Sequence, residues 1–332
     1  MGHYDRPCSW FVARRQRIEA HKLSFVNSSR AVLYRAVMGI AIVTACRGEK
    51  PRVNSDSASV TNARQTVTGL TSATGWDSAA GSFLVIPGSD SVDAAIVLPG
   101  LTDSVLASTK RFELNGLENT ALDFFNLQGL VGSATLRVSS QSAEAAGCLT
   151  WPEGQLTGVV PAQWRVGLEA GRASGIEAVP IDAMRGRDST TLIADVLDAI
   201  SHLPQGGNTA FKGIPFSIRN AYRLVVPKSS VIVAEVVRKI NEEANPREEH
   251  VFIVAERRST GGGYQLAFHM ISAGAEESLE TTDLLAAIKV ARTGNLALVV
   301  SFDYEDGGKV GLLEEISEGT WRVVWKSAYT GC

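Results

Sequence analysis

The chain has 332 residues, of which 45% are hydrophobic, and a formal net charge of −3. This length predicts about two domains, and the composition is sufficient for ordinary hydrophobic cores. The charge is uneven, because residues 1–46 hold seven Lys and Arg against two Asp and Glu, whereas the remainder holds 25 against 33. An acidic folded part disfavours nucleic acid as a partner, since a nucleic-acid binder needs a basic face to neutralise phosphates.

The most informative stretch lies near the start of the chain. Arg30 and Arg35 precede an uncharged run, residues 36–45, and the stretch ends in Val43-Thr44-Ala45-Cys46. A positive segment, a short apolar core and small residues before a processing point are typical of a secretory signal peptide. The run is too short for a comfortable transmembrane helix, which needs about 20 apolar residues.

Val43-Thr44-Ala45-Cys46 resembles the lipobox of bacterial lipoprotein precursors, with Val43 at a position where leucine is commoner. The resemblance implies that Cys46 is a lipidation site, which carries a diacylglycerol and becomes the first residue after cleavage. It also implies membrane lipid as a partner and a place in the bacterial cell envelope, with the folded domains on the extracytoplasmic side. The resemblance is confined to residues 30–46.

Two other interpretations of this stretch remain open. Residues 31–45 can act as an uncleaved membrane anchor in which Arg35 snorkels toward the surface. Alternatively, the stretch is a buried helix in which Cys46 is an ordinary small hydrophobic residue. Residues 47–68 contain few large apolar residues and predict a flexible tether, because such a segment cannot offset its ordering entropy. The expected organisation is a leader (1–46), a tether (47–68) and two domains (69–154 and 155–332).

Residues 69–154 predict a small β-rich domain. Short apolar runs at 82–86 and 94–98 each end in a Pro-Gly turn signal. A short helix is expected at 102–109, and further strands at 111–114, 121–127 and 134–138. Strands spaced by about 8–12 residues are typical of a barrel or a sandwich.

Residues 155–332 predict a larger antiparallel α+β domain. A helix is expected from Asp188 or Ser189 to Leu203, because apolar residues recur along one helical face and Pro204 follows. A second helix is expected at 282–292, and a hairpin at 163–181. Strands are expected at 215–226, 230–240, 250–258, 264–272, 296–304, 309–316 and 320–326. The predicted fold class is therefore α+β, and the order of helix then three strands suggests two αβββ halves.

Two cysteines follow the leader, Cys148 and Cys332. A pair of cysteines in an exported protein is most simply a disulfide. The bond would join the end of the first domain to the end of the chain. The alternative is two free thiols that lie too far apart to bond.

Trp321 and Trp325 are candidates for a ligand or partner groove. They lie four residues apart in an expected strand, so alternation predicts that both side chains point to the same face. The alternative is a place in the core, which is the commoner environment of a strand tryptophan.

Motifs that carry chemistry are missing from the sequence. No Gly-x-Ser-x-Gly sequence occurs, and His202, His250 and His269 lack a second metal ligand at zinc-site spacing. The run that begins at Asp303 only superficially follows the spacing of a calcium loop, and Asp306-Gly307 favours a hairpin turn. No catalytic residue, metal or cofactor is predicted.

The leading hypothesis is a lipid-anchored extracytoplasmic protein with a binding or structural role, such as an accessory subunit of an envelope or membrane complex. One alternative is an exported hydrolase with a site between the two domains, since catalytic groups can be assembled from distant residues. Another is a single-span membrane protein that tethers an assembly.

Overall fold

The computed structural model describes residues 75–331, except residues 89–92, 109–111, 113, 115, 139–147, 204–208, 228, 242–245, 259–260 and 276–277. The leader, the tether and Cys332 lie outside the described residues. Strands dominate what is described, with 56% of residues in strands and 14% in helix, so the α+β prediction is wrong. The two α-helices of the described part are α2 (Asp103–Ser108) and α3 (Arg187–Ser201). Neither is long and apolar enough to cross a membrane.

The N-terminal strands close into a six-stranded antiparallel barrel, with the order β1-β2-β5-β4-β3-β6. Large apolar side chains such as Phe83, Phe124 and Leu136 are fully buried in it. Residue 154 is the expected end of the first domain, but the barrel continues past it, because β5 and β6 are needed to close the barrel. The elements of this part are η1 (Ser78–Ala80), β1 (Leu84–Pro87), β2 (Asp93–Val97), β3 (Thr120–Asn126), β4 (Gly129–Val138), β5 (Glu153–Thr157) and β6 (Val166–Glu169).

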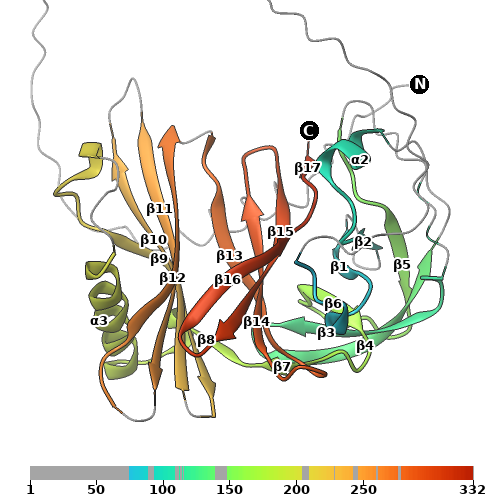
Figure 1. Ribbon diagram of the computed structural model, residues 1–332, viewed down its shortest axis with the longest axis horizontal. Coiled ribbons are helices and arrows are strands. Elements are labelled where there is room, and N and C mark those ends of the chain that lie inside the picture. Colours follow the sequence, from blue (N-terminus) through green and yellow to red (C-terminus); the bar gives the residue numbers. More distant parts are fainter. Residues whose placement is uncertain are drawn as a thin grey trace, which may run out of the picture.

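The rest of the described chain forms two antiparallel sheets. One has the order β12-β11-β10-β9-β8, and the other the order β16-β15-β14-β13-β7, with β17 paired to β15. Figure 1 shows four layers, namely α3, the first sheet, the second sheet and the barrel. The strands are β7 (Ala173–Ile176), β8 (Ala178–Pro180), β9 (Ser217–Val226), β10 (Ser229–Ile240), β11 (Arg247–Arg258), β12 (Gln265–Ala275), β13 (Thr281–Val290), β14 (Leu296–Asp303), β15 (Gly307–Ser317), β16 (Thr320–Lys326) and β17 (Thr330–Gly331).

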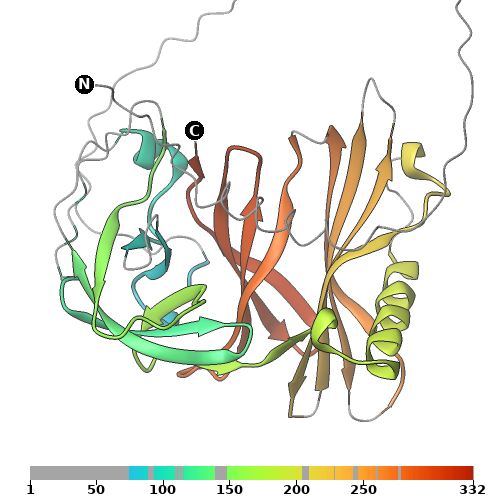
Figure 2. The ribbon, with the colours of Figure 1, turned by 180° about the vertical axis from the view of Figure 1, so that it is seen from behind.

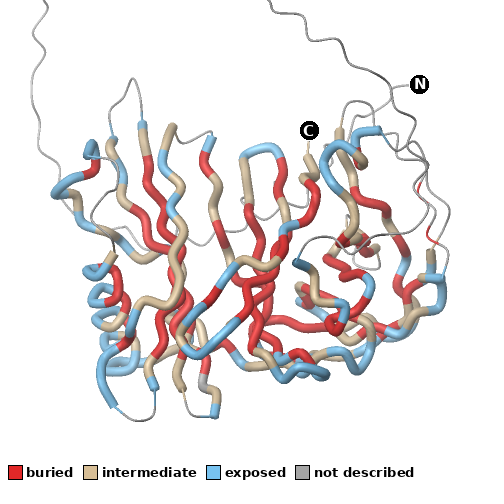
Figure 3. Tube along the Cα trace, in the orientation of Figure 1, coloured by how far each residue is buried: buried red, intermediate tan, exposed pale blue. Residues whose placement is uncertain are grey.

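Both sheets are covered on both faces, as the buried central strands in Figure 3 show. On β10, Ile232 and Ala234 face α3, whereas Val231 and Val233 lie between the sheets. The second sheet packs its outer face on the barrel through residues such as Val299. Because alternate residues of a strand point to opposite faces, strands covered on both faces carry continuous apolar runs rather than alternating ones.

The helix expected at 282–292 is instead strand β13. Its run Leu284–Ile288 is fully buried, and a bulge between Leu284 and Ala286 interrupts the alternation. As a result, Leu285, Ala286 and Ile288 join the barrel side of the sheet, and Leu284 and Ala287 join the space between the sheets. This burial pattern is neither the strict alternation of a strand nor the stripe of a helix. A short apolar run in the sequence does not distinguish a buried strand from a buried helix. The proposed αβββ repeat is therefore wrong as well.

The hairpin expected at 163–181 is also wrong. β6 pairs with β1 and β3 in the barrel, whereas β7 pairs with β13. The segment from β7 to β8 thus leads from the barrel to the first sheet, and through η2 (Ile181–Ala183) to α3 (Figure 2).

The first helix of the second domain is confirmed as α3. Leu192, Val196, Ala199 and Ile200 are buried against the first sheet, and Ile193 and Leu197 lie outside this contact, 40% and 44% exposed. A short 3-10 helix, η3 (Thr209–Phe211), follows α3 and buries Phe211.

Candidate functional site

The two tryptophans proposed for a groove lie in different cores. Trp321 is buried between the two sheets, whereas Trp325 is buried against the barrel. The indole N–H of Trp325 donates to the carbonyl of Pro99 at 3.2 Å, and its ring packs edge-on against Trp76. A bulge in the pairing of β15 with β16 inserts Val324 and reverses the expected alternation. Trp321 and Trp325 therefore form no common surface.

Cys148 lies beside a short contact between distant parts of the chain. Its neighbour Leu149 forms an isolated antiparallel bridge with Gly331, in which each backbone N–H donates to the other carbonyl at 2.9 Å. Cys332, the expected partner of Cys148, lies outside the described residues.

A network of charged groups lies around His250, in which Glu235, Glu248 and His250 are buried and the two cations reach the surface. Nδ1 of His250 lies 3.0 Å from Oε1 of Glu235, and Nε2 lies 2.7 Å from Oε2 of Glu248. Lys239 also contacts Glu248, and Arg219 contacts Glu235. We call Arg219, Glu235, Lys239, Glu248 and His250 the His250 network.

The charges of this network balance one another. Burial alone would lower the pKa of Arg219, but Glu235, Asp283 and Asp303 outweigh burial and raise it. Burial alone would raise the pKa of Glu248, but hydrogen bonds from Lys239 and His250 lower it. These partners therefore favour the ionised forms of Arg219 and Glu248.

The His250 network does not have the geometry of a catalytic base. A general base needs a ring nitrogen that can accept a proton from a hydroxyl or a water. Both ring nitrogens of His250 already face carboxylates, and the residue is 6% exposed. The described residues also contain no group of three or more His, Cys, Asp or Glu placed to hold a metal ion. Glu235 also accepts a hydrogen bond from the backbone N–H of Thr282 in the opposite sheet, so the network is suited to holding the two sheets together.

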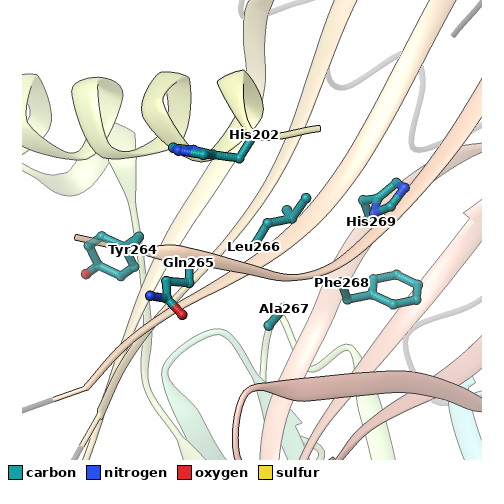
Figure 4. A pocket seen from close by; sticks show the side chains of 7 residues that line it. All are labelled: His202, Tyr264, Gln265, Leu266, Ala267, Phe268 and His269. Carbon is teal, nitrogen blue, oxygen red and sulfur yellow. The ribbon is translucent and has the colours of Figure 1, made fainter. Parts of the chain in front are cut away.

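A groove of about 500 Å³, open to solvent, lies between the end of α3 and strand β12. Figure 4 shows His202 at the end of the helix, with Leu266 and His269 on the same side of β12. We call this hollow, lined by His202 and residues 264–269, the α3–β12 groove. Nδ1 of His202 lies 2.8 Å from the carbonyl oxygen of Asp198, so this nitrogen carries the proton.

The groove adjoins a strand at the edge of the first sheet. Within the described part of the chain, β12 pairs only with β11, so its outer side presents backbone donors and acceptors. Its 11 residues include neither Asp, Glu, Lys, Arg nor Pro. Ile271, near its middle, is 42% exposed. We call this outer side the β12 edge.

The other three terminal strands are protected. β8 has three residues and includes Pro180, and β16 carries Arg322 and Lys326. β7 has four residues, and its Gly175 lies against the backbone of Gly129 in the barrel. Short length, proline, charge and cover are the usual ways in which proteins prevent pairing at a sheet edge. Among its described residues the β12 edge has none of these four, and its one interruption is a bulge near Ala267.

An exported hydrolase would need a site between the two expected domains. The space between the barrel and the second sheet is filled by apolar side chains from both parts, including Leu285, Ile288, Leu312 and Trp325. Of the three histidines in the described part of the chain, His250 lies in the network named after it, and His202 and His269 share the groove. The predicted strand at 264–272 indicated β12, but only the sheet order identifies it as an edge. No protein-family model, curated protein or solved structure matches this chain.

Proposed function

We propose that this chain is a non-enzymatic assembly protein of the bacterial cell envelope, which binds an extended segment of its partner along the β12 edge. The observation that carries the proposal is this long, uncharged edge beside an open groove. A strand that adds to a sheet edge gains affinity from backbone hydrogen bonds and specificity from pockets for its side chains. The β12 edge offers the backbone hydrogen bonds, and the α3–β12 groove offers a pocket for side chains.

The remaining features support binding rather than catalysis. Glu235 and Glu248 are occupied by His250, and Glu235 also joins the two sheets through the backbone N–H of Thr282. The described lining of the groove consists of apolar residues, Gln265, Tyr264 and two histidines. The hydroxyl of Tyr264 is hydrogen-bonded to that of Ser230 at 2.8 Å.

The second part of the proposal is attachment through the lipid on Cys46, with residues 47–68 as the tether. It is supported by the lipobox-like sequence and by the change from a basic leader to an acidic remainder. Mass spectrometry of the N-terminal peptide from isolated membranes tests it. The proposal predicts a peptide that begins with diacylated Cys46. An intact leader would contradict it and favour the uncleaved anchor at 31–45.

Copurification tests the binding part. The full chain would be expressed with its leader, solubilised from membranes in mild detergent and compared with Ile271→Lys and Ile316→Lys. Ile316 is a matched control, because it is 46% exposed and lies on β15 of the other sheet. The proposal predicts that a tagged wild type and a tagged Ile316→Lys retain a partner (another protein or an untagged, coexpressed copy of this chain) in fixed stoichiometry, and that Ile271→Lys loses it. Retention of the partner by Ile271→Lys would contradict the proposal.

A further inference from the structure

We infer that the partner strand at the β12 edge is β12 of a second copy of this chain, so that two copies form one continuous sheet. This inference rests on the proposed function and names the partner at the same site. The inference is argued from the absence of charged residues at the β12 edge, from the order of large and small side chains along β12 and from the position of the bulge in β12.

Charge favours a second copy at this edge. Residues 47–332 hold 33 acidic and 25 basic residues, so two copies carry net charge of the same sign and need an uncharged surface at which to meet. An identical strand brings like charges together wherever the edge is charged, as at Arg322 and Lys326 on β16. The β12 edge has no such charge, because residues 259–275 include neither Asp, Glu, Lys nor Arg.

Cross-strand pairing defines the two faces of β12. Phe268 and Met270 lie opposite Val254 and Phe252, which face the space between the sheets. His269 and Ile271 lie opposite Ile253 and Val251, which face α3. A bulge near Ala267 interrupts the pairing with β11, so the regular part of β12 is residues 268–275.

The regular part of β12 is complementary to itself. A two-fold axis perpendicular to the sheet at Ile271 places this residue opposite the partner's Ile271 and keeps the α3 faces of both copies on one side. It then places Phe268 opposite the partner's Gly274, His269 opposite the partner's Ala273, and Met270 opposite the partner's Ser272. Beyond the two isoleucines at the axis, each large side chain faces a small one, which suits close cross-strand contact.

This arrangement accounts for the exposed Ile271 and for the groove. Ile271 lies on the α3 face of β12, and the two copies cover each other's isoleucine at the axis. Because the partner strand runs antiparallel, its C-terminal half passes beside His269 and the α3–β12 groove. Such an interface is isologous, and it closes after two copies instead of growing into a filament.

Sedimentation velocity of the full chain in mild non-ionic detergent, over a range of protein concentrations, tests the inference. The expected result is a reversible monomer–dimer equilibrium for the wild type and Ile316→Lys. Ile271→Lys is expected to weaken the dimer by about 100-fold, since it removes two buried isoleucines and places two lysines face to face. Circular dichroism checks that Ile271→Lys is folded, which its exposed position favours.

A wild type that stays monomeric would overturn the inference, and so would a dimer that Ile271→Lys leaves intact. These results are distinguishable from failure of the proposed function. A monomer that still copurifies with a different protein, and loses it in Ile271→Lys, would overturn self-pairing and leave the β12 edge as the binding surface. If the wild type is monomeric and Ile271→Lys loses no copurifying protein, both self-pairing and the proposed binding function are overturned.

Discussion

The carboxylate of Glu235 accepts a hydrogen bond from the backbone N–H of Thr282, which lies 3.1 Å away in the opposite sheet. The same oxygen, Oε1, faces Nδ1 of His250, and Oε2 contacts Arg219. Glu235 is 2% exposed, so its contacts with His250 and Thr282 are shielded from water, whereas its partner Arg219 reaches the surface. This residue therefore connects the two sheets directly, and the His250 network contributes to stability.

Replacing Glu235 by Ala tests this role. The change leaves Nδ1 of His250 and the backbone N–H of Thr282 without their common partner, and a buried polar group that loses its partner typically costs about 1–3 kcal/mol. Urea unfolding followed by tryptophan fluorescence measures the free energy of unfolding. Glu305→Ala is a suitable control, because Glu305 is exposed in the turn between β14 and β15. A loss no larger than that of the control would contradict the structural role of Glu235.

The pH dependence of stability gives a second test, at Glu248. Burial opposes ionisation of this carboxyl, but Lys239 and His250 hold its pKa below the usual value in the folded state. A lowered folded-state pKa stabilises the protein above the pKa of the unfolded chain, and the contribution disappears as the pH falls through the folded-state pKa. Glu248→Gln is therefore expected to destabilise at pH 7 and to have less effect near pH 3. An equal effect at both pH values would contradict this assignment.

Much of the secondary structure could be predicted from the sequence, whereas the assembly of the sheets could not. The stripe along α3 and the turns around β9, β10 and β11 are local signals, and the elements formed as predicted. The bulges near Leu285 and Val324 shift side chains from one face to the other, and their cause lies in the pairing with neighbouring strands. Whether β12 is an edge depends on long-range order, which the sequence of β12 does not contain.

The junction between the barrel and the second sheet depends on a close approach at Gly175. A Cβ atom on this residue would lie 2.4 Å from the amide nitrogen of Leu130 and 2.6 Å from Cα of Gly129. Because these are backbone atoms, they cannot move aside as a flexible side chain can. Gly175→Ala is expected to lower the free energy of unfolding by about 1–3 kcal/mol. Gly263→Ala is the control, since its nearest atom would be 3.8 Å away, and equal stability of the two variants would contradict this explanation.

We propose that Cys148 and Cys332 form a disulfide. The bridge between Leu149 and Gly331 supports it, because each cysteine is the sequence neighbour of one bridged residue. In the chain-entropy model, closing so long a loop stabilises the folded state by about 4–5 kcal/mol. Cys148→Ser is expected to lower stability in non-reducing buffer and to leave the stability in reducing buffer nearly unchanged. Two titratable thiols in the denatured, unreduced chain that begins at Cys46 would be evidence against the bond.

Hydrogen exchange at β12 tests the central claim most directly. The full chain in native membranes would be compared with Ile271→Lys, and peptides covering Gln265–Ala275 would be followed by mass spectrometry. If the β12 edge is the binding surface, the amides that point away from β11 exchange slowly in the wild type and faster in Ile271→Lys, while those of β16 are unchanged. Equal exchange of β12 in the two proteins would contradict the account.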